Sequence, residues 1–319
     1  MKLSEINQKA ASFPEAFVKE SEKAFAEKIR SIALSIDENS EDRPIVLLSG
    51  PSGSGKTTSA KLVERVLDTK GHETHIISMD NYYYRDDEMT LPVDEEGNVD
   101  LESPLFLDIE LLQKHIRKIS RGEKVEIPTF DFVRQRRAEE VIPLKRKKGE
   151  IVVFEGIHAL NQDVAGRAMD YAQTLFVCPG QDIEMEEGLV SQRILRLMRR
   201  MQRDLEGRGS SFASTASRLK SVSRGEDLYI LPYRHLAEMT LDTFIPYEIC
   251  VHAARLTGKL EEAVREMEQK GADMAVPEEM YQVLDILKKT TAIDEKLVPE
   301  DALIREFIGG LNLAVQTDL

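Results

Sequence analysis

A glycine-rich stretch, GPSGSGKTT at residues 50–58, has the composition of a phosphate-binding loop. It fits the pattern G-x-x-x-x-G-K-[ST], with Gly50, Gly55, Lys56 and Thr57 at the fixed positions. Glycines let backbone N–H groups approach phosphates closely, while the lysine supplies a cation and the threonine hydroxyl can bind Mg²⁺. A chance match is the alternative, but an apolar run precedes the loop and a helical pattern follows it. We expect these residues to bind the phosphates of ATP: Gly50, Ser52, Gly53, Ser54, Gly55, Lys56, Thr57 and Thr58.

Two carboxylates follow apolar, strand-like runs. Asp80 ends HETHIISMD (72–80), and Glu155 ends IVVFE. Doubly wound folds bind ligands at the carboxyl ends of their strands, so Asp80 can orient an attacking oxygen, although Asp also favours helix N-caps. Glu155 is predicted to hold the water shell of a Mg²⁺ ion bound to Thr57, with an incidental acid at a strand end as the alternative.

Arginines crowd one segment near the middle of the chain, namely Arg193, Arg196, Arg199, Arg200, Arg203 and Arg208. With few acids close in sequence, these cations would repel one another unless an anion joins them. The cluster therefore predicts a lid that closes on ATP and stabilises the charge that develops during transfer, with the glycines of EGRGSS as hinges. A nucleic-acid stripe is the alternative, but the patch is short and lacks interleaved aromatic residues.

Apolar runs and helical patterns alternate along the chain, which predicts an α/β fold: a doubly wound, mainly parallel sheet flanked by helices. Strands are expected at 45–50, 72–80, 150–160 and 172–180, with another in 232–256. Helices are expected at 15–36, 57–70, 107–120, 183–206, 258–271, 277–289 and 299–308, and two extended segments at 124–149. We expect three parts: an N-terminal helix and linker (1–40), a core that carries the P-loop (41–255) and a C-terminal helical extension (256–319).

Bulk composition narrows the class of protein. The formal net charge is −14, which argues against a protein that coats nucleic acid. No apolar run approaches the ~18 residues of a membrane span, and the N-terminus has no signal-peptide pattern. Two cysteines, Cys178 and Cys250, lie in apolar stretches and offer no disulfide framework. We expect a cytoplasmic protein without nucleic-acid or membrane partners.

Five motifs occur in one order: GPSGSGKTT, MDNYYYR (79–85), IPTFDF (127–132), FEGIHAL (154–160) and RRMQRDLEGRG (199–209). Together they resemble the uridine kinase/phosphoribulokinase family of P-loop kinases over about residues 45–250. The tail motif LIREFIGG (303–310) is similar to the C-terminal extension of bacterial uridine-kinase-like nucleoside kinases. The resemblance implies ATP and Mg²⁺ as cofactors and makes a homo-oligomer plausible.

The resemblance also implies roles for single residues. Asp80 would accept the proton of the acceptor hydroxyl and lie near Mg²⁺, and Arg200, Arg203 and Arg208 match the lid arginines. For the acceptor it implies Tyr83 beside the hydroxyl, Asp100 on ribose hydroxyls, and Phe130 and Phe132 on a nucleobase, with Gln135 in the pocket. Three positions depart from the family pattern: Phe130 replaces a tyrosine, Gln135 a pyrimidine-reading histidine, and Ser210 an arginine.

Three functions fit these residues. The first is an ATP-dependent kinase of the 5′-hydroxyl of a uridine- or cytidine-like nucleoside. The second is a kinase of a sugar, sugar phosphate or other polyol, as in phosphoribulokinases, because Arg134, Arg136 and Arg137 surround Gln135 and an anionic acceptor would need such cations. The third is a nucleotide-binding regulatory protein that transfers nothing.

Overall fold

A computed structural model of the chain describes residues 1–84, 89–131, 134, 136–208, 210–270 and 275–314. One five-stranded parallel sheet lies at the centre, in the order β2-β5-β1-β6-β9. Its strands are β1 (Ile45–Ser49), β2 (Thr74–Ser78), β5 (Ile151–Glu155), β6 (Gln173–Cys178) and β9 (Met239–Asp242). The predicted parallel α/β fold is confirmed.

The central strand β1 shows why the sheet must be covered on both faces. All five of its residues are buried. Val46 and Leu48 belong to one hydrophobic cluster, and Ile45 and Leu47 belong to the other. Because successive side chains of a strand point to opposite faces, the uninterrupted apolar run IVLL supplies both cores.

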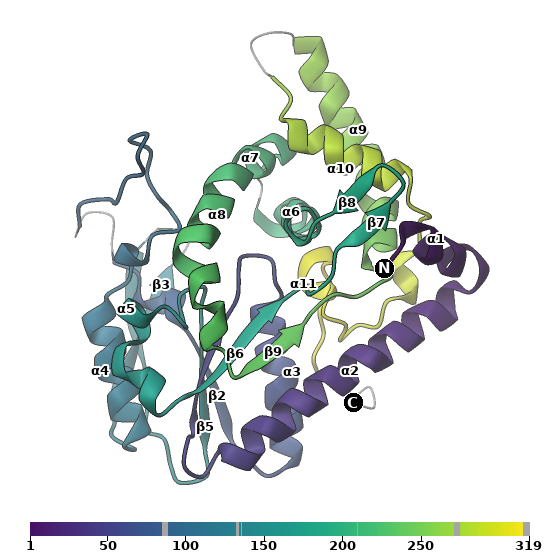
Figure 1. Cartoon of the computed structure of the whole chain (residues 1–319). Coiled ribbons are helices and arrows are strands. Elements are labelled where there is room, and N and C mark those ends of the chain that lie inside the picture. The colour runs from purple at the N-terminus through teal and green to yellow at the C-terminus, as the bar shows by residue number, and fades with distance from the viewer. Residues whose placement is uncertain (85–88, 132–133, 135, 209, 271–274, 315–319) are drawn as a thin grey trace.

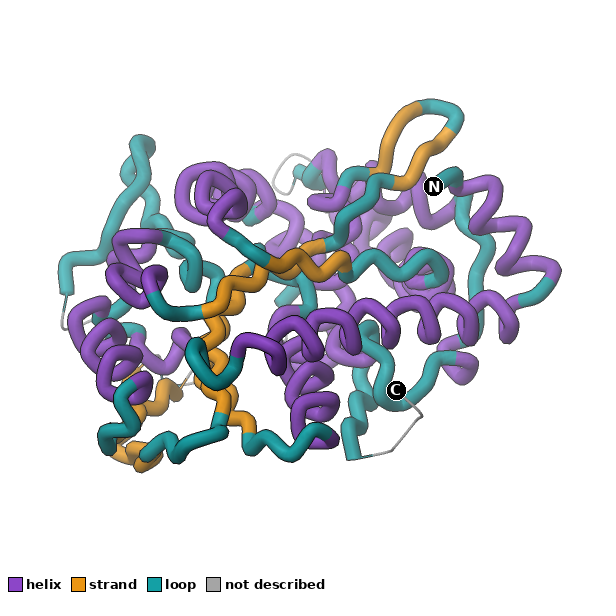
Figure 2. The backbone as a smooth tube through the Cα atoms, turned by 60° about the horizontal axis from the view of Figure 1, so that its bottom comes forward, coloured by secondary structure: helices purple, strands orange, loops and turns teal. Residues whose placement is uncertain are grey.

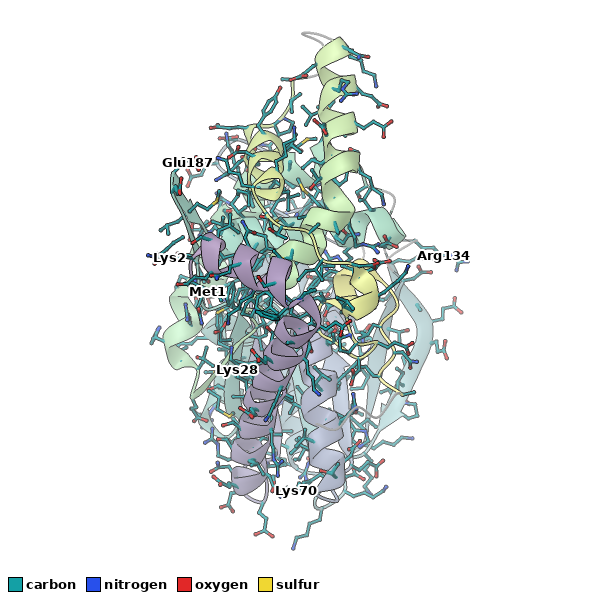
Figure 3. All side chains as sticks on the ribbon, turned by 90° about the vertical axis from the view of Figure 1, so that its right-hand side faces the viewer. Met1, Lys2, Lys28, Lys70, Arg134 and Glu187 are labelled. Atoms are coloured by element: carbon teal, nitrogen blue, oxygen red, sulfur yellow. The ribbon has the colours of Figure 1, made fainter. Side chains whose placement is uncertain are left out.

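Helices accordingly lie on both sides of the strands (Figure 2). The first cluster contains residues of the helices α1 (Leu3–Ser12), α2 (Pro14–Asn39), α3 (Lys56–Thr69), α6 (Gln192–Arg203), α7 (Phe212–Ser217), α9 (Glu248–Lys270), α10 (Glu278–Lys288) and α11 (Arg305–Ile308). Helices α4 (Ile109–Ser120) and α5 (Gln162–Ala165) contribute to the second, with the antiparallel pair β3 (Val125–Asp131) and β4 (Arg136–Leu144) beside them. Helix α8 (Leu219–Gly225) follows α7. Figure 3 shows α2 and α3 side by side, with Lys28 on α2 and Lys70 at the end of α3.

The predicted helix over 183–206 is wrong in its first third. Residues 183–190 form a small hairpin, β7 (Ile183–Met185) and β8 (Gly188–Val190). Gly188 at the turn has φ +151°, a conformation that favours glycine. Helix α6 begins only at Gln192, where the Ser191 hydroxyl accepts a hydrogen bond from the Ile194 N–H at 3.4 Å. It continues as a π-helical turn, Asp204–Arg208.

The C-terminal segment packs into the first cluster. Helix α9 runs unbroken from Glu248 to Lys270, so the boundary predicted near residue 255 falls inside a helix. It lies beside α10 at one end of the molecule (Figure 1). Leu303, Ile304, Phe307 and Ile308 are all buried there. Within the described ranges, no helix has both the length and the apolar character needed to cross a bilayer.

Candidate active site

The glycine-rich loop joins β1 to α3, as the sequence predicted, and two of its glycines are required by geometry. A Cβ at Gly50 would lie 2.0 Å from the carbonyl oxygen of Val177 on β6, so only glycine allows this close approach. Gly55 has φ +87° and precedes the first turn of α3. The loop therefore brings its residues, and N–H groups of that turn that have no partner inside the helix, to one end of the central strand, the usual arrangement for binding an anion.

Lys56 is the first residue of α3, and its ammonium lies 3.3 Å from the Pro51 carbonyl oxygen. Burial lowers the pKa of Lys56, and surrounding carboxylates oppose that shift. These carboxylates are Glu155, Asp80, Glu306 and Glu102. Two of them, Glu102 and Glu306, were not among the predicted site residues.

Thr57 and Glu155 provide oxygen atoms suited to Mg²⁺. The Thr57 hydroxyl donates to a carboxylate oxygen of Glu155 at 3.4 Å, and Glu155 ends β5 with only 7% of its surface exposed. Burial raises the pKa of Glu155, while Lys56 opposes the shift. A hydroxyl and a carboxylate are ligands that Mg²⁺ prefers, so Thr57 and Glu155, with Asp80 close by, fit such an ion.

Asp80 follows β2 in a 3₁₀ turn, Met79–Tyr82. The N-cap role considered for it belongs to Ser78, whose hydroxyl accepts a hydrogen bond from the Asp80 N–H at 3.4 Å. The Asp80 carboxylate instead interacts with the Tyr83 hydroxyl, and its charge raises the pKa of Lys56. Burial, and then the Asp80 charge, raise the pKa of Tyr83 well above its usual value. Asp80 is thus near both the phosphate-binding loop and an aromatic side chain.

That aromatic side chain is one of a pair. The rings of Tyr83 and Phe130 meet edge to face, with centroids 5.8 Å apart. Asn81 fixes the approach of β3, because its side-chain oxygen accepts a hydrogen bond from the Phe130 N–H at 3.2 Å. Two other residues predicted for this pocket, Phe132 and Gln135, lie outside the described residues.

Asp100 is buried, which excludes the alternative of a solvated turn residue. Its Oδ2 accepts hydrogen bonds from the Arg224 guanidinium at 2.9 Å and the Tyr229 hydroxyl at 2.8 Å. Its Oδ1 has no hydrogen-bond partner in the described part of the chain. Arg224 and Tyr229 lie more than 120 residues away in sequence, and no local pattern pointed to them.

Glu102 and His158 extend this polar cluster. Burial raises the pKa of Glu102 to about 7, an effect that the charge of Arg200 opposes. Burial lowers the pKa of His158 to about 4, so its imidazole is neutral at pH 7. Among the described residues, Glu102 Oε2 and His158 Nδ1 also lack hydrogen-bond partners. Buried polar atoms are normally satisfied, so this cluster can bind a polar ligand or water.

The arginines of α6 are not the unneutralised group that the sequence suggested. Arg199 is completely buried and forms an ion pair with Glu248, and it donates to the carbonyl oxygens of Gly53 and Ser54 at 3.1 and 3.2 Å. Arg196 pairs with Glu226 and donates to the Ser52 carbonyl oxygen at 3.0 Å. The expectation that these cations need an added anion is wrong for Arg196 and Arg199, because carboxylates from later segments of the chain neutralise them.

Arg200, Arg203 and Arg208 were the three arginines predicted to act in the lid. Arg200 lies beside the loop: its Cγ would be 3.4 Å from a Cβ at Gly53. Burial lowers its pKa, and Glu102 opposes that shift. The Nε of Arg203 lies 4.0 Å from Oδ1 of Asp204. Arg208 ends the π-helical turn, and its side chain lies outside the described structure.

The arginines near β4 also differ from one another. Arg137 donates to the carbonyl oxygens of Tyr82 and Tyr83, both at 3.0 Å, and pairs with Asp108 at 3.0 Å. Arg134 extends from the edge of the molecule (Figure 3), and 68% of its side chain is exposed. Arg137 therefore braces the segment that carries Tyr83, while Arg134 is a surface cation.

Comparison with known families matches residues 45–248 to the Phosphoribulokinase / Uridine kinase family. The chain belongs to this family. Uridine kinases of Bacillus cereus (strain B4264) and Bacillus mycoides (strain KBAB4) are 31% and 32% identical to it over 202 residues, which are 63% of this chain and 86% of each relative. The family resemblance predicted from the five motifs is confirmed.

A solved structure described as a candidate fructose transport system kinase from Silicibacter sp. TM1040 also aligns with the chain. Its TM-score is 0.50 at 17% identity, over 66% of this chain and 98% of that one, and it supports the fold alone. Membership of the phosphoribulokinase/uridine kinase family makes the protein a phosphotransferase that acts on a small molecule.

Proposed function

We propose that this family member transfers the γ-phosphoryl group of ATP, with Mg²⁺, to the 5′-hydroxyl of a uridine- or cytidine-like nucleoside. One observation carries the proposal: the Asp80 carboxylate is near enough to both Lys56 of the phosphate-binding loop and Tyr83 for its charge to raise the pKa of each. A carboxylate between a phosphate donor site and an aromatic pocket is suited to orient an acceptor hydroxyl toward the terminal phosphorus.

Each step has a residue that can perform it. Loop N–H groups, Lys56 and Arg200 bind the phosphates and stabilise the charge on the transferring group. Asp80 accepts the hydroxyl proton as the oxygen–phosphorus bond forms. Thr57 and Glu155, with Asp80, would hold Mg²⁺, which supplies charge neutralisation when bound.

The acceptor side supports a nucleoside. Asp100 keeps one buried oxygen without a protein partner among the described residues, and a carboxylate oxygen can accept hydrogen bonds from ribose hydroxyls. Tyr83 and Phe130 offer aromatic surface for a base. The relatives at 31% and 32% identity are named uridine kinases, which favours a pyrimidine nucleoside.

A sugar phosphate or other anionic polyol is the second candidate. The observation that favours it is Arg224, which pairs with Asp100 while 33% of its side chain remains exposed. A guanidinium in that position can bind an anionic group on the acceptor.

The test is a coupled ADP-release assay with Mg-ATP over a panel of nucleosides, sugars and ribulose 5-phosphate. We expect a pyrimidine nucleoside to give the highest kcat/KM. Stimulation by ribulose 5-phosphate and not by any nucleoside would transfer the assignment to the second candidate. Release stimulated by no acceptor would refute both.

Asp80→Asn is expected to lower kcat by about a hundredfold or more while changing the Kd for ATP little, because the lost carboxylate acts on the hydroxyl. Asp170→Asn, at an exposed position remote from the loop, is the matched control. An Asp80→Asn enzyme with normal turnover would remove Asp80 from the mechanism.

A further inference from the structure

The tail motif LIREFIGG has no role in the proposed reaction, yet it packs directly on the phosphate-binding loop. Leu303 is fully buried, and its Cδ1 would lie 2.9 Å from a Cβ at Gly55. Phe307 is also fully buried, with the Arg199 guanidinium 5.1 Å from its ring centroid. Arg305 secures the segment by donating to the carbonyl oxygens of Glu295, Val298 and Pro299.

This packing brings a carboxylate to the start of α3. Oε2 of Glu306 accepts a hydrogen bond from the Thr58 hydroxyl at 2.5 Å and from the Thr58 backbone N–H at 3.3 Å. Thr58 is the third residue of α3, so its N–H is one of the donors that have no partner inside the helix. An anionic side chain thus occupies donors of the first turn, where a phosphate-binding loop normally binds its phosphate.

The local charge makes this contact costly for a nucleotide. Lys56 already has Glu155, Asp80 and Glu102 around it, and Glu306 adds a fourth carboxylate. A polyphosphate arriving beside Glu306 meets both a like charge and a donor that is already used. The two anions therefore compete for the same N–H and hydroxyl.

We propose that Glu306 is a built-in competitor of the nucleotide: it holds the phosphate position at the start of α3 in the unliganded protein and leaves it when phosphates bind. The inference rests on the proposed nucleotide site. It gives the C-terminal segment a regulatory role, because anything that moves Glu306 away from Thr58 raises the affinity for nucleotide.

The side chain of Glu306 moves in this mechanism, and the segment stays in place. Leu303, Ile304, Phe307 and Ile308 are 0–2% exposed, and removing them from the core would expose a large apolar surface. Glu306 itself is only partly buried, so a change of side-chain rotamer can free Thr58 without unpacking its neighbours.

The experiment measures the Kd for Mg-ADP and for inorganic triphosphate by titration calorimetry, in the full chain. Glu306→Gln removes the charge at constant size, and Glu306→Ala removes the acceptor as well. We expect both variants to bind both probes about tenfold more tightly than the wild type, given the strength of hydrogen bonds to charged groups. Glu300→Gln makes the same charge change at an exposed position of the same segment, and its Kd values should match the wild type.

Three other outcomes would overturn the inference, and the third would also overturn the proposed function. If the wild type binds Mg-ADP but the Glu306 variants bind equally or more weakly, Glu306 is no competitor and the inference fails alone. Tighter binding of Mg-ADP without tighter binding of triphosphate would also overturn it, since the competition is for phosphate. If no version of the protein binds either probe, the nucleotide site itself is wrong, and the proposed function fails with the inference.

Discussion

The glycine-rich loop and helix α6 lie against each other, and both carry cations toward the expected phosphates. The loop takes its geometry from nine consecutive residues, with Lys56 fixed at the start of α3. Two arginines of α6 instead form ion pairs with acids that are distant in sequence. Arg196 pairs with Glu226, 30 residues later, and Arg199 pairs with Glu248, 49 residues later.

This difference separates binding residues from structural ones. An arginine whose charge is matched by a buried carboxylate has little left to offer a ligand, and here Arg199 supports the loop by donating to its carbonyl oxygens. Among the described residues no carboxylate forms a salt bridge with Lys56 or Arg200, so we expect both cations to be available for phosphate. Four substitutions test this division, from the largest expected effect to the smallest.

Of the four substitutions, Lys56→Ala should reduce phosphoryl transfer the most. In the proposed reaction the Lys56 ammonium stabilises the transferring group, so its loss should lower kcat/KM by about a thousandfold, or roughly 4 kcal/mol of transition-state stabilisation. Steady-state assays with the best acceptor measure this. Lys61→Ala, at an exposed position of the same helix, should behave as the wild type. Transfer reduced less than tenfold would show that the loop does not depend on its lysine.

Arg199→Met should lower the stability of the folded protein. It leaves Glu248 buried without its cation, which should cost about 3 to 5 kcal/mol in the free energy of unfolding. Urea unfolding measures the loss. The double variant Arg199→Met/Glu248→Met removes both charges and should recover much of it. A double variant as unstable as the single one would mean that the hydrogen bonds to the loop carbonyls, and not the charge pair, carry the stability.

Arg200→Met, one residue further along α6, should lower activity and leave stability nearly unchanged. Among the described residues no carboxylate forms a salt bridge with its guanidinium, and Glu102, whose charge acts on Arg200, can take up a proton instead. We expect kcat/KM to fall by about a hundredfold, with the free energy of unfolding changed by about 1 kcal/mol or less. Urea unfolding and steady-state kinetics on one preparation give both numbers. Loss of stability with normal turnover would assign Arg200 to the structural class.

The same contrast explains how much the sequence could predict. The strands, the loop and the Thr57–Glu155 contact were predictable, because each follows from a short run of residues and from the rule that parallel strands end at one edge. The contacts of Asp100 with Arg224 and Tyr229, and of Thr58 with Glu306, were not. Thr58 and Glu306 are 248 residues apart, and only the packing of Leu303 and Phe307 brings them together.

Local patterning also failed where a short hairpin interrupted a charged segment. Residues 183–190 combine four apolar residues with three acids and a glycine, so helical and extended patterns were hard to distinguish there. Pairing of β7 with β8 and the contact of Glu184 with the N-terminal residues decide the outcome, and neither is visible in a sequence window.

Glu102→Gln should change how nucleotide binding depends on pH. Glu102 lies between the two regions, with Lys56 and Arg200 both close enough to affect its pKa, which is raised to about 7. Below pH 7 the carboxyl is neutral and leaves both cations to the phosphates. Above pH 7 it is ionised and competes for them, so wild-type affinity should fall by about threefold to tenfold as the pH rises from 6 to 8.

The Kd ratio of wild type to Glu102→Gln at each pH isolates this effect, because the titration of the nucleotide itself cancels. The ratio should be near one at pH 6 and rise through pH 7, whereas the ratio for Glu95→Gln, an exposed acid seven residues earlier, should stay flat. The same ionisation should destabilise the wild type: a carboxyl with a raised folded pKa binds more protons in the native state, so stability is lost as the pH rises through 7. A flat ratio would show that Glu102 does not share the cations of the loop and α6, and that the two regions bind phosphate without a titrating link between them.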